Sequence, residues 1–75
     1  MTDKVTEAEL KELFFAKEHA HSIYAALAAR DTNRLPLEDR FTADLEYQRA
    51  LKVAAKAAEA YGRALQRFLA AEQAA

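Results

Sequence analysis

The 75-residue chain has no cysteine, no tryptophan, one glycine and one proline. The absence of cysteine excludes a disulfide framework and a cysteine-ligated zinc site. The single glycine, Gly62, excludes the glycine-rich loops that hold phosphate groups. Ser22 is the only serine, so nucleophilic catalysis has few candidate residues. We therefore expect no enzymatic activity, no catalytic residue and no cofactor.

The chain also lacks a long apolar run and an excess of one charge. Charged residues interrupt every stretch of the roughly 20 residues that a membrane-spanning helix needs. The net charge of −1 disfavours general binding to nucleic acid or to an anionic membrane. The first residues include acids and carry no basic, apolar leader, which favours a cytoplasmic protein. We therefore expect a protein with neither a nucleic-acid nor a membrane partner.

The sequence predicts two helices that together include most of its residues. Thr6 and Glu9 have the spacing of a capping box, which predicts that a first helix begins near residue 7 and runs to about residue 30. Residues 31–36 gather turn-forming side chains, and Pro36 suits the start of a second helix over about 37–72. Thr42 offers an alternative, in which it caps a fresh helix and the second helix is broken there.

This layout predicts a single all-α domain over residues 1–75, a two-helix antiparallel α-hairpin whose second helix is longer. At 1.5 Å per residue the helices would be roughly 36 Å and roughly 54 Å long. A turn centred near Asn33 places Ala20 beside Tyr47 and Thr6 beside Tyr61. The first helix would then end before it reaches Leu65, Phe68 and Leu69, so these apolar residues would need cover from another chain.

The second helix carries two regular series of residues. One series alternates by four and three residues, which is the spacing of a helix-packing seam: Tyr47, Leu51, Ala54, Ala58, Tyr61, Leu65 and Phe68. The other is a line of alanines at seven-residue intervals, at Ala43, Ala50, Ala57, Ala64 and Ala71. Small residues permit close helix approach, so both series predict contact with a partner. Ala64 and Ala71 would either face another chain or make no contact.

Helix 1 has one main apolar stripe, which comprises Leu10, Leu13, Ala16, Ala20, Ile23, Tyr24 and Leu27. Phe15 lies far from this stripe, beside several alanines, and suggests a second contact surface. Near the expected turn, Leu37, Phe41 and Leu45 form a further stripe that helix 1 alone would not bury. These positions all indicate helix packing.

Glu18 and His21 have the Glu-x-x-His spacing with which some four-helix bundles bind a pair of iron ions. Two copies could double this ligand set, although neither side chain lies on the apolar stripe. We expect these residues to be solvated, and no metal site is favoured. A small metal-binding, di-iron-like bundle remains the alternative hypothesis.

The function expected from the sequence is therefore that of a non-enzymatic protein–protein interaction module, such as a small accessory, adaptor or chaperone-like subunit. A small domain buries a modest share of its surface, which favours oligomerisation. The expected partner is a second copy, giving a homodimeric four-helix bundle, or a larger helical protein. The expected interface comprises Tyr47, Leu51, Ala54, Ala57, Ala58, Tyr61, Ala64, Leu65, Phe68, Leu69 and Phe15.

Overall fold

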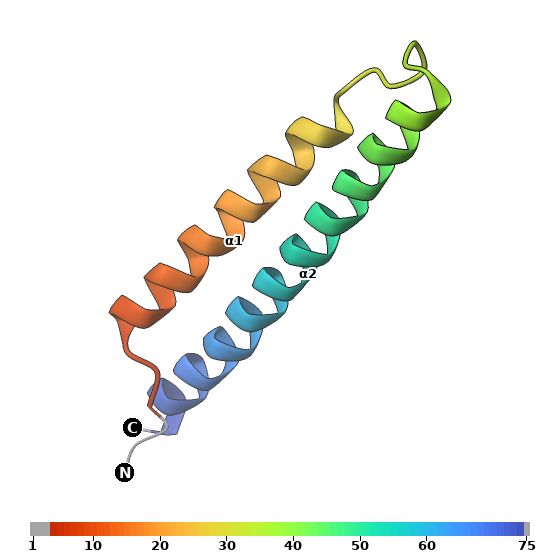
Figure 1. Cartoon of the computed structure of the whole chain (residues 1–75). Coiled ribbons are helices and arrows are strands. Elements are labelled where there is room, and N and C mark those ends of the chain that lie inside the picture. The colour runs from red at the N-terminus through yellow and green to blue at the C-terminus, as the bar shows by residue number, and fades with distance from the viewer. Residues whose placement is uncertain (1–3, 75) are drawn as a thin grey trace.

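The computed structural model describes residues 4–74 and consists of two antiparallel helices, α1 (Glu7–Ala28) and α2 (Leu37–Ala74). Figure 1 shows α1 lying beside α2, which continues past α1 at both ends. The longest dimension, 58 Å, matches the length of about 57 Å expected for the 38 residues of α2. The predicted all-α hairpin with a longer second helix is confirmed.

The first helix begins at the predicted capping box. The Thr6 hydroxyl accepts from the Glu9 amide at 3.1 Å, and the Thr6 amide donates to the Glu9 carboxylate at 3.2 Å. Glu7 and Glu9 add negative charge to the first turn, where the helix dipole is positive. Local sequence therefore fixes the start of α1.

The connection between the helices spans residues 29–36, because α1 ends at Ala28 rather than near Arg30. The Asp31 carboxylate accepts from the Asn33 amide at 3.1 Å, and a second turn joins Leu35 N–H to Thr32 C=O at 3.1 Å. The alternative of a break at Thr42 is wrong. α2 is continuous there, and the Thr42 hydroxyl donates to the Glu38 carbonyl at 3.2 Å inside the helix.

The helices pair in a different register from the predicted one. Phe14, not Thr6, lies beside Tyr61, with 5.5 Å between ring centroids, and Tyr24, not Ala20, lies beside Tyr47 at 5.4 Å. The reason is the double turn of the connection, which leaves the start of α2 beyond the end of α1 (Figure 1). The far end of α2 is therefore better covered than predicted, and Leu65 and Phe68 are half-buried.

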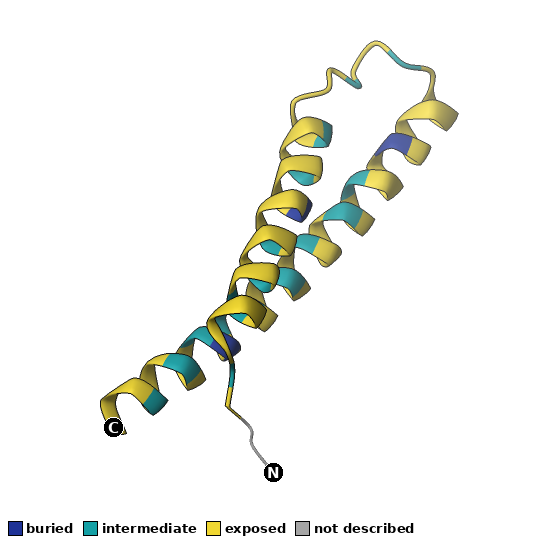
Figure 2. Ribbon diagram, turned by 90° about the vertical axis from the view of Figure 1, so that its left-hand side faces the viewer, coloured by how far each residue is buried: buried dark blue, intermediate teal, exposed yellow. Residues whose placement is uncertain are grey.

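The buried residues among those described are three alanines, Ala20, Ala43 and Ala64, which are 7%, 5% and 7% exposed. Figure 2 shows buried positions, in dark blue, on both helices. Because Ala64 is already buried by its own chain, the prediction that it faces another chain is wrong. The line of spaced alanines lies within the hairpin and belongs to the α2 seam, whose members are all buried or half-buried: Ala43, Tyr47, Ala50, Ala54, Ala57, Tyr61, Ala64, Phe68 and Ala71.

On α1 the covered residues follow the same alternation of three and four: Leu10, Leu13, Lys17, Ala20, Tyr24 and Leu27. Ala16 and Ile23, which were predicted to belong to this stripe, are exposed instead. The seam includes a lysine that the apolar pattern did not select. The Lys17 ammonium lies 5.1 Å from the ring centre of Phe14 and 5.2 Å from that of Tyr61. Lys17 therefore packs its aliphatic stem in the seam and its charge against two aromatic rings.

Tyr24 and Tyr47 form a polar contact within the otherwise apolar seam. The Tyr47 hydroxyl donates to the Tyr24 hydroxyl at 3.3 Å, and both residues are half-buried. This hydrogen bond, with burial as a second cause, raises the pKa of Tyr47 above its ordinary value of 10.0. The folded chain therefore holds the Tyr47 proton more tightly than the unfolded chain does.

This pKa shift predicts that the hairpin loses stability in alkaline solution. A raised folded-state pKa contributes stability below pH 10.0, and this contribution is lost as the pH rises through the raised value. Tyr24→Phe removes the largest cause of the shift, so the pKa of Tyr47 should fall toward its ordinary value. NMR titration of the Tyr47 ring signals measures this change for that residue alone, and an unchanged pKa of Tyr47 in Tyr24→Phe would contradict the hydrogen bond.

Candidate functional site

Most of the large apolar side chains of this protein remain exposed. Nine of them, in the described residues, are more than a third exposed: Phe14, Phe15, Ile23, Leu37, Phe41, Leu45, Leu51, Val53 and Leu69. Single exposed apolar residues are common, but side chains that gather on one face indicate a contact surface. Their arrangement on the two helices therefore decides whether the hairpin carries a binding site.

One group of apolar residues follows α2 beside the seam. These residues alternate by four and three, and we call them the Gly62 face: Leu51, Ala55, Ala58, Gly62, Leu65 and Leu69. Gly62 and Leu65 are half-buried and the other four are exposed. The alternation is that of a second helix-packing stripe, parallel to the one that contacts α1. α2 therefore has two adjacent packing faces, of which α1 covers one.

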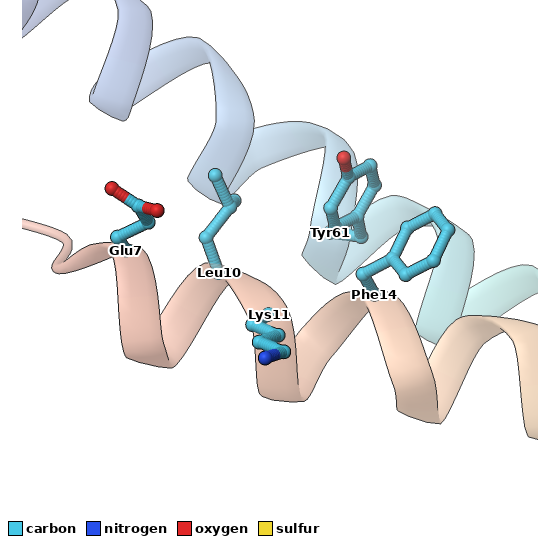
Figure 3. Close-up of a pocket in the computed structure, with 5 residues that line it drawn as sticks. All are labelled: Glu7, Leu10, Lys11, Phe14 and Tyr61. Carbon is cyan, nitrogen blue, oxygen red and sulfur yellow. The ribbon is translucent and has the colours of Figure 1, made fainter.

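The α1 border of the Gly62 face is lined by aromatic and charged residues. Figure 3 shows Phe14 and Tyr61 side by side, with Leu10 projecting toward α2. Together with Glu7 and Lys11 these residues line an open surface hollow. Phe14 extends the apolar surface of α2 across the seam onto α1.

The predicted interface residues divide between the two faces of α2. Six of them lie in the seam that faces α1: Tyr47, Ala54, Ala57, Tyr61, Ala64 and Phe68. The remaining predicted residues of α2, Leu51, Ala58, Leu65 and Leu69, lie on the Gly62 face. The structure thus separates two stripes that the sequence analysis had merged. The reason is that α1 packs on the side of α2 that carries the regularly spaced alanines, all of which are buried or half-buried.

Two further apolar groups lie away from the Gly62 face. On the opposite side of the hairpin, Ile23 and Val53 line a small apolar hollow with Ala20, Arg49 and Ala50. We call Ile23, Val53 and Ala60 the Val53 face. Near the hairpin tip Leu37 and Phe41 are 77% and 67% exposed. Phe15 is 57% exposed on the outer side of α1, and its ring is tilted against that of Phe14, with 6.1 Å between centroids.

Glu18 and His21 line a hollow with Ala54 and Ala58, but Lys17 also lines it. The Lys17 ammonium lies 3.1 Å from the Glu18 carboxylate, so a positive charge already occupies the position next to the acid. Among residues 4–74, no group of three or more His, Cys, Asp or Glu side chains is placed to hold a metal ion. Within one chain, the geometry does not favour the metal hypothesis.

Ala55, Gly62 and Phe14 were not predicted from the sequence as members of an exposed face. The signal was present, because Ala55 and Gly62 continue the four-and-three alternation that begins at Leu51. This alternation was not recognised because alanine and glycine occur at both buried and exposed positions. In addition, the seam predicted from the sequence placed Leu51 and Ala58 on the same side of the helix as Tyr47. The choice between the stripes depends on the helix register, which the turn determines.

Comparison with known proteins returns no match for this chain to a protein family, a curated protein or a solved structure. Neither described helix is apolar over enough of its length to cross a membrane. The proposals that follow therefore depend on the residues and geometry of the hairpin.

Proposed function

We propose that this chain is a non-enzymatic helical interaction module, which binds another helical surface through the exposed apolar residues of α2. The observation that carries the proposal is the distribution of large and small side chains. Among residues 4–74 the buried residues are Ala20, Ala43 and Ala64, while Leu51, Val53 and Leu69 stay exposed on α2. This folded chain buries small apolar residues and leaves large ones exposed. It therefore gains stability when a partner covers the large exposed residues.

The geometry supports a helix as the bound element. The Gly62 face is narrow and regular and runs along about five turns of α2. It has leucines at its two ends and the small residues Ala55, Ala58 and Gly62 between them. Such a stripe fits the ridges of another helix, which insert between its leucines. It offers few polar groups along its centre, so recognition depends on shape and on the charges at its border.

The test compares the wild-type chain with a variant in which Leu51→Gln and Leu69→Gln are combined. Both leucines are exposed, so the substitutions should change the unfolding free energy of the isolated hairpin by no more than about 0.5 kcal/mol each. They should abolish association. Light scattering should give a wild-type mass above the 8.4 kDa of one chain, and the variant should stay at that mass.

If the wild-type chain is monomeric, the same pair of proteins is used as bait for helical partners. A partner that binds the wild-type chain and fails to bind the glutamine variant supports the proposal. The proposal is wrong if the wild-type chain neither self-associates nor binds a partner, or if association is equal for both proteins.

A further inference from the structure

Gly62 has no role inside its own hairpin. Glycine in the interior of a helix is about 1 kcal/mol less favourable than alanine. The backbone of Gly62 does not have a positive φ angle, and a Cβ atom placed on it would meet no other atom within 4 Å. Neither backbone conformation nor close approach of α1 therefore accounts for glycine at this position. What the missing side chain creates is a notch in the exposed surface of α2.

The notch lies among four residues of the stripe, Leu51, Ala55, Ala58 and Gly62, that can pair with the same four residues of a second copy. If a second α2 helix runs antiparallel, with Ala55 of one copy beside Ala58 of the other, Leu51 of each copy lies over Gly62 of its partner. The two-fold axis passes between Ala55 and Ala58 and repeats every contact. Leu51 is exposed and available for this contact. A large side chain then meets the one residue of the stripe that has none.

The charges beside the stripe agree with the same register. Lys52 and Glu59 each follow a member of the Gly62 face by one residue, on the border away from α1. In the antiparallel register, Lys52 of each copy lies next to Glu59 of its partner. The Glu59 carboxylate is held on this side of the helix by Arg63, at 2.6 Å. A parallel arrangement would instead place Leu51 beside Leu51, and it would put Lys52 and Glu59 of the two copies on opposite sides of the contact, where they could not pair.

We infer that the Gly62 face binds a second copy of this chain, with the two α2 helices antiparallel and Leu51 seated in the Gly62 notch of the partner. The inference rests on the proposed function, since it names the partner of the same surface. The two α2 helices form the centre of the resulting four-helix bundle, and Phe14 lies at its edge.

Gly62→Ala separates this contact from the stability of the hairpin. Because nothing crowds the added Cβ, the variant monomer should unfold at a higher urea concentration than the wild-type monomer. The same methyl group fills the notch twice per dimer, so the dissociation constant should rise about tenfold or more in sedimentation equilibrium. An unchanged or lowered dissociation constant would overturn the inference.

Two alanines provide a matched comparison of the two exposed faces. Ala58→Leu places bulk on the Gly62 face, and Ala60→Leu places the same bulk on the Val53 face, within one turn of the same helix; both alanines are exposed. Ala58→Leu should prevent dimerisation and Ala60→Leu should leave it intact. The reverse result would assign the contact to the Val53 face, which refutes this inference but leaves the proposed function standing. A wild-type chain that is monomeric at all concentrations refutes the inference as well.

The register is tested by exchanging charges. Lys52→Glu and Glu59→Lys each bring two pairs of like charges together in the antiparallel dimer, and each should weaken it about threefold to tenfold at low salt. The double variant restores opposite charges and should recover the wild-type dissociation constant. If the double variant is as weak as, or weaker than, the single variants, the proposed register is wrong.

Discussion

Replacing Ala64 with leucine is expected to destabilise the hairpin by about 1–3 kcal/mol, because three further carbon atoms must enter a contact that leaves Ala64 7% exposed. The core of a chain this small rarely supplies more than about 3–5 kcal/mol of stability. The substitution should therefore leave a large unfolded fraction at low protein concentration. Circular dichroism during urea titration measures the change in unfolding free energy.

Ala70→Leu is the matched control, since Ala70 lies on the same part of α2 and is exposed. Alanine and leucine have similar helix propensities, so both variants change the intrinsic stability of α2 by a similar amount. The difference between them isolates packing against α1. Equal urea midpoints for the two variants would show that the N-terminal part of α1 does not cover Ala64.

Replacing Lys17 with leucine should stabilise the isolated hairpin by about 1 kcal/mol. Lys17 is half-buried at a position of the α1 seam that its neighbours fill with apolar side chains. A buried leucine contributes about 1.5–3 kcal/mol, whereas contacts of the ammonium group with Phe14 and Tyr61 contribute about 0.5–1 kcal/mol each. The increase in the midpoint of urea unfolding measures the gain.

A lysine at a seam position also restricts how the helices pair, since its charge must reach solvent or an aromatic face. Lys17→Leu removes this restriction, so the variant should form aggregates or mixed oligomers, visible by light scattering, that the wild-type chain does not form. Lys11→Leu is the control, because Lys11 is exposed on α1 and lies outside the seam. If Lys17→Leu is less stable than the wild-type chain and Lys11→Leu is not, then Lys17 stabilises the hairpin more than an apolar side chain would, and the predicted gain is wrong.

Local signals in the sequence were sufficient to predict the two helices. The capping box of Thr6 and Glu9, the turn residues around Asn33 and the position of Pro36 each act over a few residues, and each appears at the expected place. These features predict where a helix starts or stops without reference to the rest of the chain. The fold class followed directly from them.

The register could not be predicted in the same way. It depends on how many residues the connection uses and on the path that they take, and the second turn at Thr32–Leu35 changes the pairing by about one to two helical turns. A shift of that size changes which residues α1 covers at the far end of α2. Two neighbouring stripes of α2 are both apolar, so hydrophobicity alone did not identify the one that faces α1. Hydrophobicity also did not predict the seam position of Lys17. The aliphatic stem of a lysine packs like an apolar residue only where a partner surface is present.

The alanine core also has a consequence for the lifetime of the chain in a cell. A monomer held by contacts as small as those of Ala20, Ala43 and Ala64 unfolds often, and each unfolding exposes its backbone to proteases. Binding through α2 lowers the unfolded fraction in proportion to the partner that is present. Copies made in excess of their partner would therefore be degraded faster than bound copies, and the amount of this protein would follow the amount of its partner without any further control.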